Sequence, residues 1–165
     1  MFRKWFGRED TAQSPELTVP VKGKVIPLEE VPDPVFAEKM MGDGVAVVPE
    51  DGTLVSPTEG KVVQLFPTHH AIGIQTLQGL EILLHIGLDT VNMKGEGFTA
   101  QVAVGDRVKS GQPLIRFSLE KVEKQAASTV TPIVITNMEL VEKLEPTYTG
   151  NVQEAGEKML RITLK

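Results

Sequence analysis

The chain has 165 residues, a net charge of −5 at pH 7 and no cysteine. This length fits one domain, which buries roughly 70% of its unfolded surface and needs neither a disulfide nor a structural metal for its core. Charges of both signs are mixed along the chain and form no basic stripe, so nucleic acid is not an expected partner. No stretch approaches the ~20 consecutive apolar residues of a membrane-spanning helix. The absence of cysteine excludes a thiolate zinc site and predicts a reducing, cytoplasmic location.

The first residues are predicted to lie outside the folded domain. Residues 1–8 interleave aromatic side chains with cations, and on a helix the aromatic side chains would share one face. Such a face suits a weak peripheral contact with a membrane surface, and a disordered leader is the alternative. Because a polar stretch follows, we predict a flexible N-terminal segment over residues 1–20 and a single folded domain over residues 21–165.

The domain alternates short β-branched segments with turn residues such as Gly42-Asp43-Gly44 and Gly95-Glu96-Gly97. Strands at such close spacing predict an all-β sandwich or barrel. In chain order, strands are expected at residues 25–26, 45–48, 53–55, 61–66, 71–76, 80–86, 98–104, 113–118, 130–136 and 161–164. Helical patterning is confined to short connectors, expected at residues 34–41, 119–127 and 137–144.

All histidines of the chain lie on two neighbouring predicted strands, as His69, His70 and His85. Alternation along the second strand places His85 and Leu83 on the face opposite to Ile82. Adjacent His69 and His70 point to opposite sides, so one of them can join His85, and spacing does not decide which. An imidazole acts near pH 7 as a nucleophile, a proton donor or a metal ligand. The alternative is that one histidine is a core residue and the others lie on the surface.

Paired histidines without other catalytic motifs favour phosphoryl transfer that needs no cofactor. The chain lacks a phosphate-binding loop, a zinc-protease motif and a serine-hydrolase motif. One ring nitrogen would attack phosphorus, while the second histidine would stabilise the equatorial oxygens. Gly87 leaves room for a partner backbone, or for its own carbonyl to orient the His85 ring and fix its tautomer, and it fits a simple turn or bulge equally well.

Two other chemistries stay open at this point. A zinc hydrolase would use the histidines with Asp89 as ligands. A biotinyl or lipoyl carrier is suggested by residues 53–60 and 104–114, which look like the paired hairpins of those modules. Its carrier lysine would be Lys94, which lacks the flanking residues that such modules show.

Several blocks of the chain, in order, closely resemble the glucose-family enzyme IIA of the bacterial phosphoenolpyruvate-dependent sugar phosphotransferase system. They are residues 34–46, 68–71, 85–91, 94–98 and 128–137. The resemblance implies an antiparallel β-sandwich with Greek-key and jelly-roll-like connections. It also implies a phosphotransferase, namely a phosphocarrier that accepts a phosphoryl group from phospho-HPr and donates it to the IIB domain of a sugar permease.

The same resemblance implies roles for single residues. His85 would be phosphorylated on Nε2, His70 would support the phosphoryl group, and His69 would be a bystander. Thr68 would orient the histidine network, and Asp89 would lie beside the site.

A partner surface around the histidines is also implied. Its apolar ring would be Phe36, Val35, Phe66, Leu83 and Val91, and its negative rim Asp33, Glu38 and Asp89. Filling the core is the alternative role for Phe36 and Phe66.

A second possible function is a regulatory module that binds target proteins through this face, with Zn²⁺ held between His70 and His85 in the complex.

Overall fold

The computed structural model describes residues 14–165, in which every pair of neighbouring strands is antiparallel. The strands are β1 (Glu16–Thr18), β2 (Gly23–Pro27), β3 (Asp43–Pro49), β4 (Thr53–Val55), β5 (Gly60–Leu65), β6 (Ala71–Thr76), β7 (Glu81–His85), β8 (Phe98–Ala100), β9 (Arg107–Val108), β10 (Pro113–Phe117), β11 (Thr131–Ile135), β12 (Val141–Pro146), β13 (Val152–Gln153) and β14 (Lys158–Leu164). The helical segments are η1 (Leu28–Glu30), α2 (Pro34–Ala37), η2 (Thr90–Met93), α3 (Leu119–Gln125) and η3 (Met138–Leu140).

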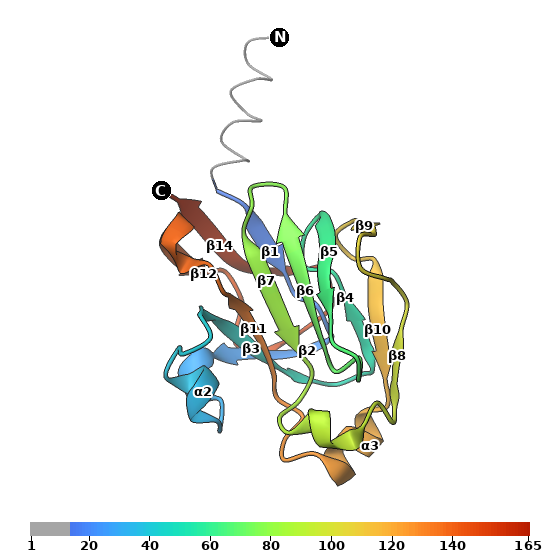
Figure 1. Cartoon of the computed structure of the whole chain (residues 1–165). Helices are drawn as coiled ribbons and strands as arrows, with labels where there is room; N and C mark the ends of the chain where they lie inside the picture. The colour runs from blue at the N-terminus through green and yellow to red at the C-terminus, as the bar shows by residue number, and fades with distance from the viewer. Residues whose placement is uncertain (1–13) are drawn as a thin grey trace.

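One large sheet and two small sheets build the molecule. The large sheet has eight strands in the order β13-β2-β3-β11-β7-β6-β5-β9, and the three-stranded sheets are β1-β14-β12 and β4-β10-β8. Strands β5, β6 and β7 follow one another as a meander and run side by side (Figure 1). Strand β11 comes from a distant part of the chain and inserts between β3 and β7. The predicted antiparallel β-sandwich with short helical connectors is confirmed.

The main core lies between the large sheet and the two small ones. Alternate side chains of β6 and β7, including Ile72, Ile74 and Leu84, are completely buried against Leu54 and Ile115 from the small sheets. Burying one such side chain stabilises the fold by about 1.5–3 kcal/mol. The alternation seen in the sequence of β7 therefore has its expected cause in the core.

A second apolar cluster covers the outer face of the large sheet. The sheet contributes Ala46, Ala71, Leu83 and Val134, and the segments that pack on them contribute Leu28, Val31, Phe36 and Leu88. Because the middle of the sheet is covered on both faces, every residue of β11 is buried. This outer cluster extends to the end of β7, where His85 lies.

The predicted boundary between leader and domain needs correction. Strand β1, Glu16–Thr18, lies inside the segment 1–20 that was expected to be flexible, and it pairs with β14. Leu17 and Val19 are buried in the main core, so the folded part begins before Val21. The cause is pairing with the last strand of the chain, which local composition does not indicate. Residues 1–8, with the predicted membrane contact, lie outside the described residues.

The helix expected at residues 137–144 is also wrong. Only Met138–Leu140 is helical, as a single 3-10 turn, and Val141–Pro146 is a strand that pairs with β14. Tertiary pairing here overrides a local apolar spacing that fits a helix. No helix within residues 14–165 is long and apolar enough to cross a membrane.

Candidate active site

The register of two neighbouring strands brings His70 and His85 together. Ala71, the first residue of β6, lies opposite His85, the last residue of β7. The Ile86 N–H donates to the His70 carbonyl at 2.8 Å, which fixes the two segments to each other. The ring centroids of His70 and His85 are 5.0 Å apart, and the rings are nearly perpendicular, at 79°. Two imidazoles therefore meet at one edge of the outer cluster.

A turn before β6 explains why His70 is the histidine that faces His85. The His69 N–H donates to the Phe66 carbonyl at 2.8 Å, and His69 has a left-handed backbone with φ of 59°. Strand alternation therefore starts only at Ala71. If the strand continued backwards from Ala71, alternation would place His69 on the side of His85. The turn places His70 there instead.

The tautomer of His85 is set by a backbone carbonyl. His85 Nδ1 donates to the Gly87 carbonyl at 2.7 Å, because a carbonyl oxygen can only accept. In the neutral ring, Nε2 then has no proton and carries the free electron pair. Gly87 has φ of 69°, and a Cβ there would lie 2.7 Å from Thr90 Cγ2 and 2.9 Å from the Ser128 carbonyl. Only glycine fits this turn, and the orienting role predicted for its carbonyl matches the geometry.

His70 is held by the hydroxyl of Thr68. Thr68 Oγ1 forms a hydrogen bond with His70 Nδ1, and the Phe66 ring meets His70 edge-on at a centroid distance of 5.4 Å. The side chain is buried, and burial, with a smaller effect of His85, lowers the pKa of His70 to about 4. His70 is therefore a neutral hydrogen-bonding group at pH 7.

Opposing effects act on His85. Burial lowers its pKa below the usual 6.5, whereas the Gly87 carbonyl and the carboxylates of Asp33 and Asp89 raise it. Burial is the largest effect, so His85 is also neutral at pH 7. Asp33 is the N-cap of α2, and Asp89 is exposed with a left-handed backbone just before η2. Both carboxylates therefore come from segments that flank the end of β7.

The predicted apolar ring divides into buried and exposed members. The Phe36 ring lies 5.3 Å from the His85 ring, and Phe36 and Leu83 are buried in the outer cluster that Phe66 also contacts. Val35 in α2 and Val91 in η2 are instead 40% and 53% exposed. The aromatic residues thus belong to a small core and also contact the histidines, while the two valines are available to a partner.

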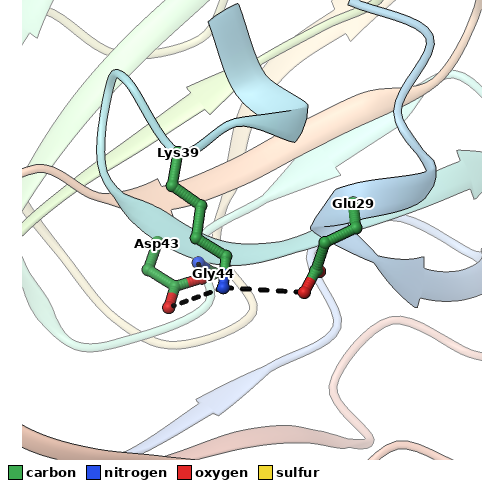
Figure 2. A network of polar contacts seen from close by, with 4 residues as sticks. All are labelled: Glu29, Lys39, Asp43 and Gly44. Carbon is green, nitrogen blue, oxygen red and sulfur yellow. Dashed lines mark hydrogen bonds and ion pairs between the residues drawn. The ribbon is translucent and has the colours of Figure 1, made fainter. Parts of the chain in front are cut away.

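The segment that carries Phe36 and Val35 is anchored by hydrogen bonds and ion pairs. The Asp33 side chain accepts from the Val35 N–H at 2.9 Å, which begins α2. Beyond the helix, the ammonium of Lys39 lies 3.5 Å from carboxylate oxygens of both Glu29 and Asp43, as Figure 2 shows. Asp43 contributes most to raising the pKa of Lys39.

Beyond the histidines, the acidic rim and the capacity to bind a metal ion also characterise the site. Glu38, predicted for the negative rim, is exposed at the C-terminal end of α2. Within residues 14–165, no group of three or more His, Cys, Asp or Glu side chains converges in a way that could hold a metal ion. His70 and His85 supply only half of a tetrahedral zinc site, so the zinc predicted for a regulatory complex stays a prediction that needs ligands from a partner.

Sequence reasoning did not single out two buried threonines near this site. Thr90 donates to the Ile86 carbonyl, and Thr131 accepts from the Gly87 N–H. The signal that could have found them is a hydroxyl in an apolar environment, since Thr131 begins the apolar segment of β11. A buried hydroxyl has to find a hydrogen-bond partner.

Comparison with known proteins places this geometry in a family. A family model described as "phosphoenolpyruvate-dependent sugar phosphotransferase system, EIIA 1" matches residues 15–141. The chain belongs to this family. Proteins of the EIIA family are phosphotransferases that carry a phosphoryl group from HPr to a IIB domain during sugar uptake, and this chain is such a carrier.

Individual relatives agree over nearly the whole length. The "PTS system glucose-specific EIIA component" of Bacillus anthracis is 48% identical over 165 residues, which cover 100% of both chains. The protein of the same name from Halalkalibacterium halodurans is 50% identical over 172 residues, covering 100% of this chain and 98% of the relative. The solved structure of glucose permease IIA from Mycoplasma capricolum superposes with a TM-score of 0.82 at 38% identity, covering 90% of this chain and 95% of that one.

Proposed function

We propose that this EIIA protein carries its phosphoryl group on Nε2 of His85. The observation that supports this most strongly is the hydrogen bond from His85 Nδ1 to the Gly87 carbonyl, which leaves the Nε2 electron pair free beside His70. Nε2 attacks the phosphorus of phospho-HPr, and the N–P bond to His85 forms as the P–N bond of the donor breaks. A cysteine thiolate of the IIB domain then attacks the same phosphorus, and His85 leaves as a neutral imidazole. Because Nδ1 keeps its proton throughout, no proton transfer limits either step.

His70 stabilises the phosphoryl group in this proposal. If the Thr68 hydroxyl donates to His70 Nδ1, the proton of neutral His70 is on Nε2, where it can donate to a phosphoryl oxygen. A preoriented donor in a site of low dielectric stabilises the charge that spreads over the equatorial oxygens. Thr68 therefore acts through His70.

The surroundings of the histidines fit a docking surface. Apolar side chains, among them Phe36, exclude water from the labile N–P bond once a partner is bound. The carboxylates of Asp33, Glu38 and Asp89 give the rim a negative charge that would favour basic partner surfaces. We propose that HPr and the IIB domain use this face in turn.

The proposal also covers which sugar is transported and where in the cell the protein works. Relatives that are about half identical over the full length are named glucose-specific, which supports glucose as the transported sugar. We further propose that the carrier works in the cytoplasm as one IIA-type domain that includes β1. A lack of cysteine fits that compartment.

The test is the phosphoryl relay itself. The purified chain is mixed with phosphoenolpyruvate, enzyme I and HPr, and acid-labile, alkali-stable phosphate on the chain is measured. The wild type and a His69→Gln control are expected to be phosphorylated, and His85→Gln is expected to gain no phosphate. Phosphorylation of His85→Gln at the wild-type rate would contradict the assignment.

A further inference from the structure

The turn that carries the Gly87 carbonyl is bound by two buried threonine hydroxyls. Thr90 Oγ1 donates to the Ile86 carbonyl at 2.6 Å, and the Gly87 N–H donates to Thr131 Oγ1 at 3.4 Å. The Ile86 carbonyl and the Gly87 N–H belong to one peptide group, so both of its polar atoms are held. Thr90 and Thr131 are completely buried, and water therefore does not reach these bonds from outside.

Further contacts define how each threonine side chain is held. Thr131 Oγ1 donates its own proton to the Thr129 carbonyl at 3.0 Å, so a lone pair is left for the Gly87 N–H. The Thr90 methyl group packs against Gly87, 2.7 Å from the position that a Cβ would take. Thr90 thus holds the Ile86–Gly87 peptide by a hydrogen bond and supports it by packing.

The next peptide group points at the reactive histidine. The Leu88 N–H donates to the Ser128 carbonyl at 2.9 Å, while the Gly87 carbonyl accepts from His85 Nδ1 at 2.7 Å. The direction of this carbonyl is set by the backbone angles of Gly87 between two anchored peptide groups. Glycine has the most conformational freedom of all residues, so the anchors are what define these angles.

We propose that Thr90 and Thr131 are positioning residues for phosphoryl transfer, which hold the Gly87 carbonyl against His85 Nδ1 and so keep the reactive electron pair on Nε2. The inference rests on the proposed role of His85 as the phosphoryl acceptor. Without the two hydroxyls, the peptide before Gly87 loses its partners, and of the anchors described here only the bond from the Leu88 N–H to the Ser128 carbonyl still restrains the carbonyl that faces His85. The tautomer with its proton on Nε2 then becomes populated, and this tautomer cannot attack phosphorus.

The experiment compares Thr90→Val with Thr90→Ser. Nitrogen NMR of the unphosphorylated protein reports the tautomer of His85, and the relay assay reports kcat and KM for phospho-HPr. For Thr90→Val we expect a mixture of the two tautomers and a kcat about tenfold lower, at the low end of the effect known for groups that orient metal-binding histidines. KM is expected to stay unchanged because the docking face is intact. Thr90→Ser keeps the hydroxyl and is expected to restore the Nδ1–H tautomer and most of kcat.

Thr76→Val is the matched control. Thr76 is also buried, and its hydroxyl accepts from the Leu80 N–H at 3.0 Å in the turn at the other end of β6 and β7. Its loss is expected to change stability without changing the tautomer or kcat. A wild-type tautomer and kcat in Thr90→Val, or equal losses in Thr76→Val and Thr90→Val, would overturn the proposal. So would a failure of Thr90→Ser to restore either quantity.

A second variant keeps the test decisive if Thr90→Val does not fold. Thr131→Val removes the longer of the two hydrogen bonds, so a smaller tautomer shift in the same direction is expected, and a pure Nδ1–H tautomer would count against the proposal. The tautomer is measured without phosphate. Phosphorylation of the wild type at a residue other than His85 would therefore overturn the proposed function while the tautomer measurement still judges the role of the threonines.

Discussion

The two histidines of the site differ in the group that binds Nδ1. His85 Nδ1 meets the Gly87 carbonyl, which only accepts a hydrogen bond, whereas His70 Nδ1 meets the Thr68 hydroxyl, which can also donate. The first partner frees Nε2 of His85 for attack, and the second allows Nε2 of His70 to carry a proton. The different partners of Nδ1 thus suit His85 to act as a nucleophile and His70 to act as a hydrogen-bond donor.

Replacement of His70 should separate these tasks. In His70→Gln the nucleophile remains, so we expect the chain to accept a phosphoryl group from phospho-HPr. Onward transfer to the IIB domain should slow by about 10²–10³-fold, the usual effect of removing one preoriented donor from a transition state. Rapid-quench measurements of both half-reactions check this, with His69→Gln as the control. Unchanged onward transfer in His70→Gln would show that His70 has another role.

The lowered pKa of His85 predicts how acceptance depends on pH. A proton on Nε2 occupies its electron pair and prevents attack on phosphorus. Acceptance of the phosphoryl group therefore fails only when the pH falls through the pKa of His85 in the folded protein. Since burial places that pKa below 6.5, more than half of the acceptance rate seen at pH 8 should remain at pH 6.5, and the rate should be halved only at a lower pH. Single-turnover rates and an NMR titration of His85 should give the same midpoint. A midpoint at or above 6.5 would disagree with the burial of the ring.

His69 and His70 show which side-chain positions the sequence pattern could predict and which it could not. Alternation correctly predicted that Leu83 and His85 share a face of β7. It could not choose between the neighbouring histidines, because the turn before Ala71 interrupts the alternation with a left-handed residue. The similarity to the enzyme IIA family pointed to His70, the ring that lies beside His85 in the structure.

Among the elements, α2 connects the apolar cluster to the surface. Phe36 points inward to the His85 ring, while Val35 from the same helix is 40% exposed. Asp33 at its start is one of the charges that act on His85. A single short helix therefore supplies packing, charge and an exposed contact to the proposed docking face.

Val35→Ala tests the docking role of α2. An exposed valine contributes little to folding, so we expect the free energy of unfolding to change by less than about 0.5 kcal/mol. If Val35 contacts HPr, KM for phospho-HPr should rise several-fold without a change in kcat. Val104→Ala is the matched control, because Val104 is also exposed and precedes β9, away from α2 (Figure 1). Equal KM values for the two variants would remove Val35 from the partner surface.

The ion pairs of Lys39 should contribute little to stability. Its partners Glu29 and Asp43 are solvent-accessible, and exposed pairs of this kind are worth about 0–1 kcal/mol. Lys39→Met is therefore expected to lower the free energy of unfolding by at most about 1 kcal/mol. Urea unfolding should show that this difference shrinks in 1 M salt, where screening is strong. A larger loss that persists in salt would mean that packing of the lysine stem matters more than its charge.

Prediction of the elements succeeded where the pattern was local. Strands β4 and β6 have the predicted bounds, because turn residues delimit β-branched segments there. It failed for β1 and β12, which both pair with β14 at the end of the chain, and for the two-residue strands β9 and β13, which pair with β5 and β2. Such long-range pairing leaves no trace in neighbouring residues, so sequence patterns cannot reveal it.

In the whole molecule, burial of His70 links the candidate site to folding stability. The large sheet is covered on both faces, and His70 becomes buried where the outer cluster meets the end of the sheet. The folded protein resists protonation of His70, whereas the unfolded chain protonates near pH 6.5. Between pH 6.5 and about 4 the unfolded state therefore binds more protons, and stability falls as pH falls.

The effect of His70 on stability can be measured by comparing the free energy of unfolding at two pH values. With a pKa of about 4 in the folded protein, His70 should lower the free energy of unfolding by about 2 kcal/mol when the pH falls from 7 to 5. His70→Gln has no such group, so its loss over the same interval should be smaller by that amount. Urea unfolding of both proteins at the two pH values gives the double difference. A difference near zero would mean that His70 titrates normally in the folded protein.

The most direct test of the account is NMR spectroscopy of the phosphorylated, ¹⁵N-labelled protein. Coupling between phosphorus and nitrogen identifies the bonded atom, and long-range proton correlations identify the ring. We predict that phosphorus is bonded to Nε2 of His85, that the Nδ1 proton of His85 is retained, and that His70 carries no phosphate. Phosphorus bonded to His70, or to Nδ1 of His85, would contradict the account.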